Sequence, residues 1–208
     1  MNPLLKSLQP YPFQKLSYLL EGITANVSLS PINLHIGEPK HETPAFILTE
    51  LAKNLNSVAN YPTTLGSKWL RTTIATWLTQ RYQLPAIDPE TEIIPVNGSR
   101  EALFAFAQTV INSKTAEQPI VVCCNPFYQI YEGAALLAGA QPYYLIASAE
   151  QDFALDYEQL PEAIWSRTQL IYVCSPNNPT GRVMTLDEWQ QLFELSDRYG
   201  FVIASDEC

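Results

Sequence analysis

The sequence predicts an α/β protein in which a mostly parallel sheet is sandwiched between helices. Short apolar runs typical of strands buried on both faces alternate with helix-like stretches along residues 92–205, as expected for βαβ units. Polar turns follow several of these runs, and the turn at residues 175–181 holds two prolines and a glycine. The 208 residues are 47% hydrophobic and 16% charged, an ordinary balance for one or two globular domains.

Charge and hydropathy exclude several classes of function. The formal net charge is −9 and lysine and arginine are scattered singly, so no basic stripe is available to neutralise nucleic-acid phosphates. No apolar run approaches the ~18 residues that a membrane span requires. Residues 1–13 lack the apolar core of a secretion signal. These observations favour a cytoplasmic protein without a nucleic-acid or membrane partner.

Cysteine and histidine give no metal motif. The chain has four cysteines without C-x-x-C spacing: Cys123, Cys124, Cys174 and Cys208. Three of them lie in strand-like runs, where a reduced cysteine behaves as a small hydrophobe in a reducing compartment. His35 and His41 are the only histidines, and nothing beside them completes a zinc site.

The first 44 residues are expected to form an N-terminal arm and part of a small domain, and residues 45–208 a larger domain. An amphipathic helix is predicted at residues 13–20. The alternating run at residues 32–36 predicts a short strand that ends before Gly37 and Pro39.

Two further helices precede the alternating part of the chain. Pro44 is a favoured first-turn residue and predicts a helix that continues to residue 56. A turn-rich loop follows at residues 59–66. Ser67 then predicts the N-terminal cap of a helix that reaches residue 82.

From there strands and helices alternate, which predicts right-handed crossovers. Strands are expected at residues 92–96, 120–124, 142–146, 169–174 and 201–205. Helices are expected at residues 99–111, 129–138, 156–164 and 185–198. The chain stops directly after a strand-like run, and we therefore expect the front portion of a longer protein.

The turn at residues 97–102 joins a predicted strand to a predicted helix. Gly98 allows a tight turn, and the first amides of the helix are free to bind a phosphate at Ser99 and Arg100. The alternative is that Ser99 merely caps the helix, which is the commoner use of such a residue.

Aromatic residues follow another strand-like run. Tyr128 comes just after the run at residues 120–124 and could cover the ring of a ligand, since stacking contributes ~0.5–1.5 kcal/mol beyond burial. Tyr128 and Phe127 could instead be core aromatics beneath a loop. Tyr61, beside Pro62, is by itself more typical of a surface turn.

Asp206 and Asn178 complete the set of polar residues at strand ends. A carboxylate at Asp206 would keep a pyridine nitrogen protonated, because opposite charges ~4 Å apart attract by about 4 kcal/mol at an effective dielectric constant of ~20. Asn178 could donate to an oxygen on the same ring. Alternatively, Asp206 could cap a helix and Asn178 could form an Asx turn. Carboxyl ends of parallel strands share one edge of a sheet, so we expect a single site there.

Together these residues resemble the class I and II aminotransferases of fold type I, with the large domain of aspartate aminotransferase. Among family members, the sequence is most similar to succinyldiaminopimelate transaminases. The resemblance covers the whole chain and rests on residues 10–13, 32–40, 95–109, 125–133, 175–181 and 205–208.

The resemblance implies a pyridoxal 5′-phosphate cofactor and a role for each matching residue. Ser99 and Arg100 would hold the phosphate, Tyr128 would lie on the pyridine ring, Asn178 would meet its 3-oxygen and Asp206 its nitrogen. Gly37 would bind the substrate α-carboxylate, and Tyr61 would reach the phosphate of the partner subunit in a homodimer.

The resemblance implies transfer of an amino group from glutamate to a keto acid, N-succinyl-2-amino-6-oxopimelate in lysine biosynthesis. The family's Schiff-base lysine follows the aspartate, whereas no lysine here lies beyond Lys114, so this chain alone is expected to be inactive. Another amino-acid aminotransferase or a carbon–sulfur lyase is an alternative within the fold. A regulatory module that has lost catalysis is an alternative from another class.

Overall fold

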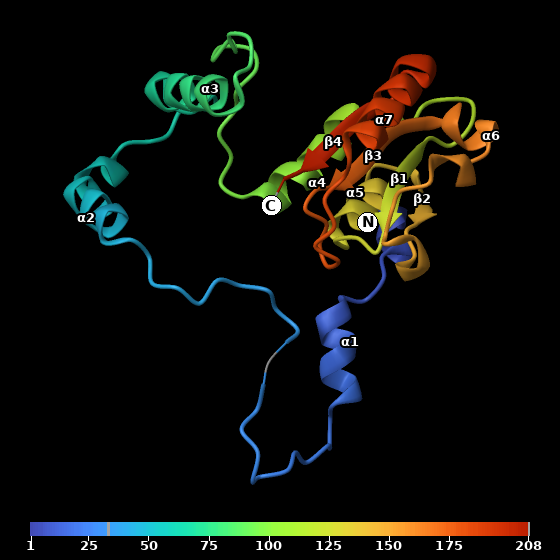
Figure 1. Ribbon diagram of the computed structural model, residues 1–208, viewed down its shortest axis with the longest axis horizontal. Coiled ribbons are helices and arrows are strands. Elements are labelled where there is room, and N and C mark those ends of the chain that lie inside the picture. The colour runs from blue at the N-terminus through green and yellow to red at the C-terminus, as the bar shows by residue number, and fades with distance from the viewer. Residues whose placement is uncertain (33, 208) are drawn as a thin grey trace. The chain divides into compact units, whose positions relative to one another are not determined.

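A computed structural model describes residues 1–32 and 34–207 (Figure 1). The chain divides into two compact units. One comprises Met1–Pro10 and Val96–Cys208, and the other comprises Tyr11–Pro95. The first unit contains the sheet.

The sheet has four strands, all parallel, in the order β2-β1-β3-β4. The strands are β1 (Ile120–Asn125), β2 (Gln141–Ile146), β3 (Thr168–Cys174) and β4 (Val202–Asp206). Central strands β1 and β3 are almost wholly buried, which explains why both read as unbroken apolar runs. The predicted parallel α/β fold is confirmed.

Helices cover both faces of the sheet (Figure 1). On one face, α4 (Ser99–Val110) and α5 (Ile130–Leu137) pack on Val121, Cys123, Leu170 and Tyr172. On the other face, α7 (Leu186–Tyr199) and α6 (Glu162–Trp165) pack on Ile120, Val122, Ile171 and Val173. Alternate residues of each strand thus face opposite cores.

Helix α7 has clear signals at both ends. Thr185 and Glu188 form a capping box, in which each side chain binds the other's backbone N–H. Gly200 ends the helix in the left-handed region at φ 76°, where glycine carries no steric penalty.

Proline interrupts one predicted helix. Residues 156–164 form a 3₁₀ turn, η4 (Tyr157–Gln159), followed by the short α6, instead of one continuous helix. Pro161 lies between them and is the N-cap of α6. Proline lacks the N–H that an interior helix position needs and forces the preceding residue into an extended conformation.

Two predicted strands do not form among the described residues. Residues 92–96 are not in a strand, and neither are Ile32 or residues 34–36, while Asn33 lies outside the description. Ile32 and Leu34 are 82% and 89% exposed. Alternating residues form a strand only when a neighbouring strand supplies hydrogen-bond partners, and the described residues provide none at either place.

The unit Tyr11–Pro95 is helical. It contains α1 (Pro12–Leu19), α2 (Ala45–Lys53), η2 (Leu55–Ala59) and α3 (Lys68–Tyr82). The Ser67 hydroxyl accepts from the Leu70 amide at 3.2 Å, so the predicted cap of α3 is confirmed. The other unit also carries the 3₁₀ turns η1 (Pro3–Ser7) and η3 (Ala149–Gln151). Among the described residues, no helix has the length and apolar character to cross a membrane.

Candidate active site

The carboxyl ends of the four strands lie at one edge of the sheet, because the strands are parallel. The turn after β1 and the turn after β3 begin at this edge, and Asp206 is the last residue of β4. The first turns of α4 line a small cavity with Ala204 and Ser205. Four of the predicted site elements therefore gather around the ends of β1, β3 and β4.

Asp206 is held through both its backbone and its side chain. It pairs with Cys174 of β3, and its carbonyl oxygen accepts from the Ser175 amide at 3.2 Å. Its carboxylate oxygen Oδ2 accepts from the Tyr131 hydroxyl at 2.6 Å. A charged acceptor and a short distance characterise a strong hydrogen bond.

Tyr131 was not identified from the sequence. It lies in the first turn of α5, is 1% exposed, and stacks on Tyr172 with ring centroids 4.6 Å apart and planes 7° from parallel. Burial, together with the hydrogen bond to the Asp206 carboxylate, raises the pKa of the Tyr131 hydroxyl far above its ordinary value. Tyr131 therefore remains a proton donor toward Asp206.

The structure joins two residues predicted to bind the cofactor. The Arg100 guanidinium Nε donates to the Tyr128 hydroxyl at 2.7 Å. Tyr128 also contacts Tyr131 edge to face, with ring centroids 6.0 Å apart. These contacts form a continuous chain from Arg100 through Tyr128 and Tyr131 to Asp206.

The start of α4 suits an anion. Gly98 is the N-cap and Ser99 is the first helical residue, so Ser99 is not the cap that the alternative interpretation required. Gly98 has no side chain with which to cap the helix. Both Ser99 and Arg100 are exposed. The amides of a first helical turn and the helix dipole favour a bound phosphate.

In the turn after β3, the structure distinguishes two adjacent asparagines. The Asn177 side chain accepts from the Thr180 hydroxyl at 3.2 Å, and its backbone carbonyl accepts from the Gly181 amide at 2.7 Å. The side-chain amide Nδ2 of Asn177 also donates to the Pro126 carbonyl at 3.5 Å, which connects this turn to the one after β1. Asn178 is exposed and forms no hydrogen bond with any residue that the structure describes. Asn177 shapes the turn, while Asn178 presents its amide at the surface.

Gly37 and Tyr61 belong to the unit Tyr11–Pro95, and both are exposed in it. The Tyr61 side chain is 99% exposed. Sequence reasoning missed Arg71, whose buried guanidinium donates to the carbonyls of Leu65 and Gly66 at 3.1 and 2.8 Å. Arg71 thereby fixes the end of the loop that carries Tyr61.

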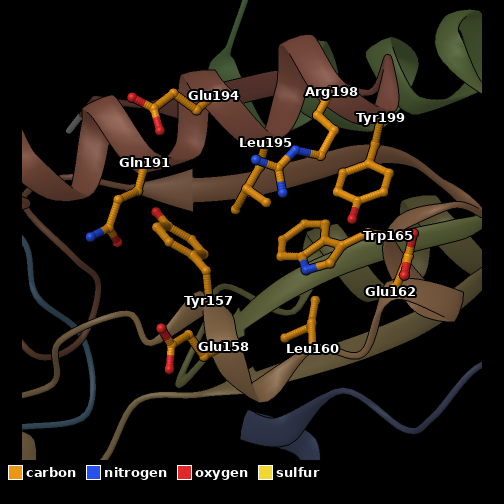
Figure 2. Close-up of a pocket in the computed structure, with 10 residues that line it drawn as sticks. All are labelled: Tyr157, Glu158, Leu160, Glu162, Trp165, Gln191, Glu194, Leu195, Arg198 and Tyr199. Carbon is orange, nitrogen blue, oxygen red and sulfur yellow. The ribbon is translucent and has the colours of Figure 1, made fainter.

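A cavity of about 420 Å³ lies elsewhere in the first unit, between α7 and the η4–α6 segment (Figure 2). Trp165 lines this cavity and stacks on Tyr199 and Phe201, with ring centroids 6.3 and 5.4 Å apart. Trp165 precedes β3 and Phe201 precedes β4, so this end of the cavity lies toward the starts of the strands. None of the predicted site residues lines it, and size alone does not make it the active site.

Comparison with known proteins identifies the family of the chain. Residues 30–208 match the family model "Aminotransferase class I and II". A curated LL-diaminopimelate aminotransferase from Aquifex aeolicus is 33% identical over 98% of this chain and 52% of its own length. The chain thus spans about half the length of the curated relatives that it matches.

Solved structures of aminotransferases are also similar to this chain. An aminotransferase from Neisseria meningitidis superposes with a TM-score of 0.93 and 49% identity, covering 100% of this chain and 52% of that one. The aminotransferase AspB from Helicobacter pylori gives a TM-score of 0.85 and 34% identity over 96% of this chain and 51% of that one.

Proposed function

The chain belongs to the class I and II aminotransferases, and from that premise we propose that the complete protein transfers an amino group from glutamate to a keto acid. Members of this family depend on pyridoxal 5′-phosphate. When bound, this cofactor supplies an electron sink for the carbon that loses a proton.

The single observation that carries the proposal is the connected set Arg100–Tyr128–Tyr131–Asp206 beside the N-terminus of α4. A negative carboxylate at one end and the N-terminus of a helix at the other suit a flat group with a basic ring nitrogen and a phosphate. The residues present therefore fit the cofactor.

Each predicted residue has a role in this proposal. Ser99 and Arg100 would bind the phosphate with their backbone amides, and Tyr128 would cover the ring. Asn178 would donate to the ring 3-oxygen, for which its exposed amide is available. Asp206 would keep the ring nitrogen protonated, and Gly37 would offer its amide to the substrate α-carboxylate.

We further propose a cytoplasmic homodimer in which Tyr61 reaches the phosphate in the partner subunit. The fully exposed side chain of Tyr61 supports this, because a residue used by another subunit needs no contacts within its own unit. In the same proposal, residues 1–44 form the arm and small-domain segment, and residues 45–208 belong to the large domain.

The amino acceptor is proposed to be a keto acid of the diaminopimelate series. Sequence resemblance favours N-succinyl-2-amino-6-oxopimelate. The curated relatives are named as LL-diaminopimelate aminotransferases, which favours an acceptor without the succinyl group. Assays of the complete protein with glutamate and each acceptor would decide between them. Activity only with unrelated keto acids, or elimination from a sulfur amino acid, would instead indicate another aminotransferase or a carbon–sulfur lyase.

Replacing the carboxylate tests the central role. In the complete protein, Asp206→Ala should lower kcat by several powers of ten, since the ring nitrogen loses its charged partner and each ~1.36 kcal/mol of barrier is tenfold in rate. The exposed Asp197 of α7 provides the matched control, and Asp197→Ala should retain normal kcat. Near-normal turnover by Asp206→Ala would refute the proposal.

A further inference from the structure

The position of Tyr131 is fixed by its own helix and by two aromatic neighbours. Its backbone is part of α5, one ring face stacks on Tyr172 of β3, and Tyr128 contacts it edge to face. The hydroxyl of Tyr172 donates in turn to the Leu103 carbonyl of α4 at 2.6 Å. The Tyr131 hydroxyl is therefore a fixed point in the structure.

Asp206, in contrast, is the final residue of a strand. Its side chain has two rotatable bonds, and it is more exposed than Tyr131. The 2.6 Å hydrogen bond from Tyr131 to Oδ2 restricts rotation of the carboxylate, because turning it would break a charge-assisted bond. A hydrogen bond from α5 thus orients the Asp206 carboxylate.

Resting on the proposed function, we propose that Tyr131 is a positioning residue that orients the Asp206 carboxylate toward the cofactor's ring nitrogen. The reason is geometric: attraction between a carboxylate and a protonated nitrogen depends on the distance and direction that the side chain maintains. Since its hydroxyl stays protonated, Tyr131 acts only by donating this hydrogen bond.

The proposal predicts the properties of Tyr131→Phe, which retains the stacked ring and loses only the hydroxyl. In the complete protein, kcat should fall about tenfold to a hundredfold, the effect of losing one hydrogen bond to a charged group. The pH midpoint of the bound cofactor's visible absorption should rise. A less protonated ring repels a proton on the cofactor's other basic nitrogen less strongly.

A double-mutant cycle separates positioning from packing. If Tyr131 acts through Asp206, then Tyr131→Phe should change neither the absorption midpoint nor cofactor affinity once Asp206→Ala is present. The control is Tyr157→Phe, which also removes a buried hydroxyl but lies outside the site. It should leave kcat and the midpoint unchanged.

Replacing Tyr131 with 3-fluorotyrosine provides a second test that preserves the hydroxyl. Because the hydrogen bond that orients the carboxylate is retained, the midpoint should stay close to that of the wild type, in contrast to Tyr131→Phe. The absorption midpoint of the 3-fluorotyrosine protein can be compared with that of the wild type even if Tyr131→Phe folds poorly.

The possible outcomes distinguish this inference from the proposed function. If the complete protein fails to bind pyridoxal 5′-phosphate, or Asp206→Ala has no effect, the proposed function fails. If it binds and Asp206→Ala is impaired, yet Tyr131→Phe leaves the midpoint unchanged or acts equally in both backgrounds, the inference alone is overturned.

Discussion

At the residue scale, the hydroxyl of Tyr157 is a buried polar group that lowers the free energy of unfolding when it has no hydrogen-bond partner. It is 5% exposed, and its hydroxyl has no hydrogen-bond partner among the described residues. Burial raises the pKa of this hydroxyl far above its ordinary value, so it remains a neutral polar group that is buried.

Removing this hydroxyl should therefore not destabilise the protein. We expect Tyr157→Phe to raise the free energy of unfolding by roughly 1 kcal/mol, the cost recovered when an unpaired buried group is removed. Urea unfolding of wild type and variant measures the difference. A loss of stability of similar size would mean that a partner, such as a buried water, satisfies the hydroxyl.

Individual site residues could be predicted only where local sequence determines their position. Asp206 and Asn178 follow apolar runs, and the ends of parallel strands are the expected places for a site. Tyr131 was missed for a different reason. The hydrogen bond of Tyr131 joins it to a residue 75 positions away, and no local pattern encodes such a pairing.

At the scale of elements, α7 depends on a buried carboxylate. Glu188 is 8% exposed and accepts from the Leu155 amide at 3.0 Å, from the Thr185 amide at 2.8 Å and from Arg182 at 2.9 Å. Burial by itself raises the pKa of Glu188, but these donors outweigh it and the pKa is lowered from its ordinary 4.5.

This shift gives a prediction with a defined sign. A carboxyl whose pKa is lowered by folding contributes stability above its unfolded pKa and loses that contribution as pH falls through the folded value. Glu188→Gln should destabilise by about 2 kcal/mol at pH 7. The difference from wild type should shrink as the pH falls below 4.5.

Thermal denaturation from pH 7 to pH 3 provides the measurement. Glu194→Gln is the control on the same helix, since Glu194 is exposed and contacts only Gln190 among the described hydrogen-bond partners. It should change stability by less than about 0.5 kcal/mol. A pH-independent loss in Glu188→Gln would contradict the assigned role of the charge.

Element predictions succeeded where a segment carries its own signals. Ser67, Thr185 and Gly200 mark helix ends through local chemistry, and β1 and β3 are too apolar to lie anywhere but the core. Residues 92–96 read as a strand yet form none, since pairing depends on a neighbour that composition does not reveal. Pro161 is a local signal against the continuous helix predicted at residues 156–164, because proline is the N-cap of α6 and separates it from η4.

At the scale of the whole molecule, β4 is a terminal strand of the described sheet. Its Val202 side chain is 39% exposed, and an edge strand offers unpaired backbone groups to other chains. The 208-residue polypeptide expressed alone should therefore self-associate.

Light scattering during size-exclusion chromatography tests this expectation. Val202→Lys should increase the monomer fraction severalfold, because a charge on an edge strand opposes pairing with another edge. Exposed Val183, which lies outside the strands, provides the control position. A well-folded monomer of the unaltered polypeptide would show that this edge does not drive association.

The proposed site lies at the carboxyl ends of the parallel strands, which leaves the amino ends of the strands available to the experimenter. Lys114 lies in an exposed turn ahead of β1, at the start of that strand. A dye or biotin attached there would report on the protein, or tether it to a sensor chip, while the ligand-facing edge remains open to solution.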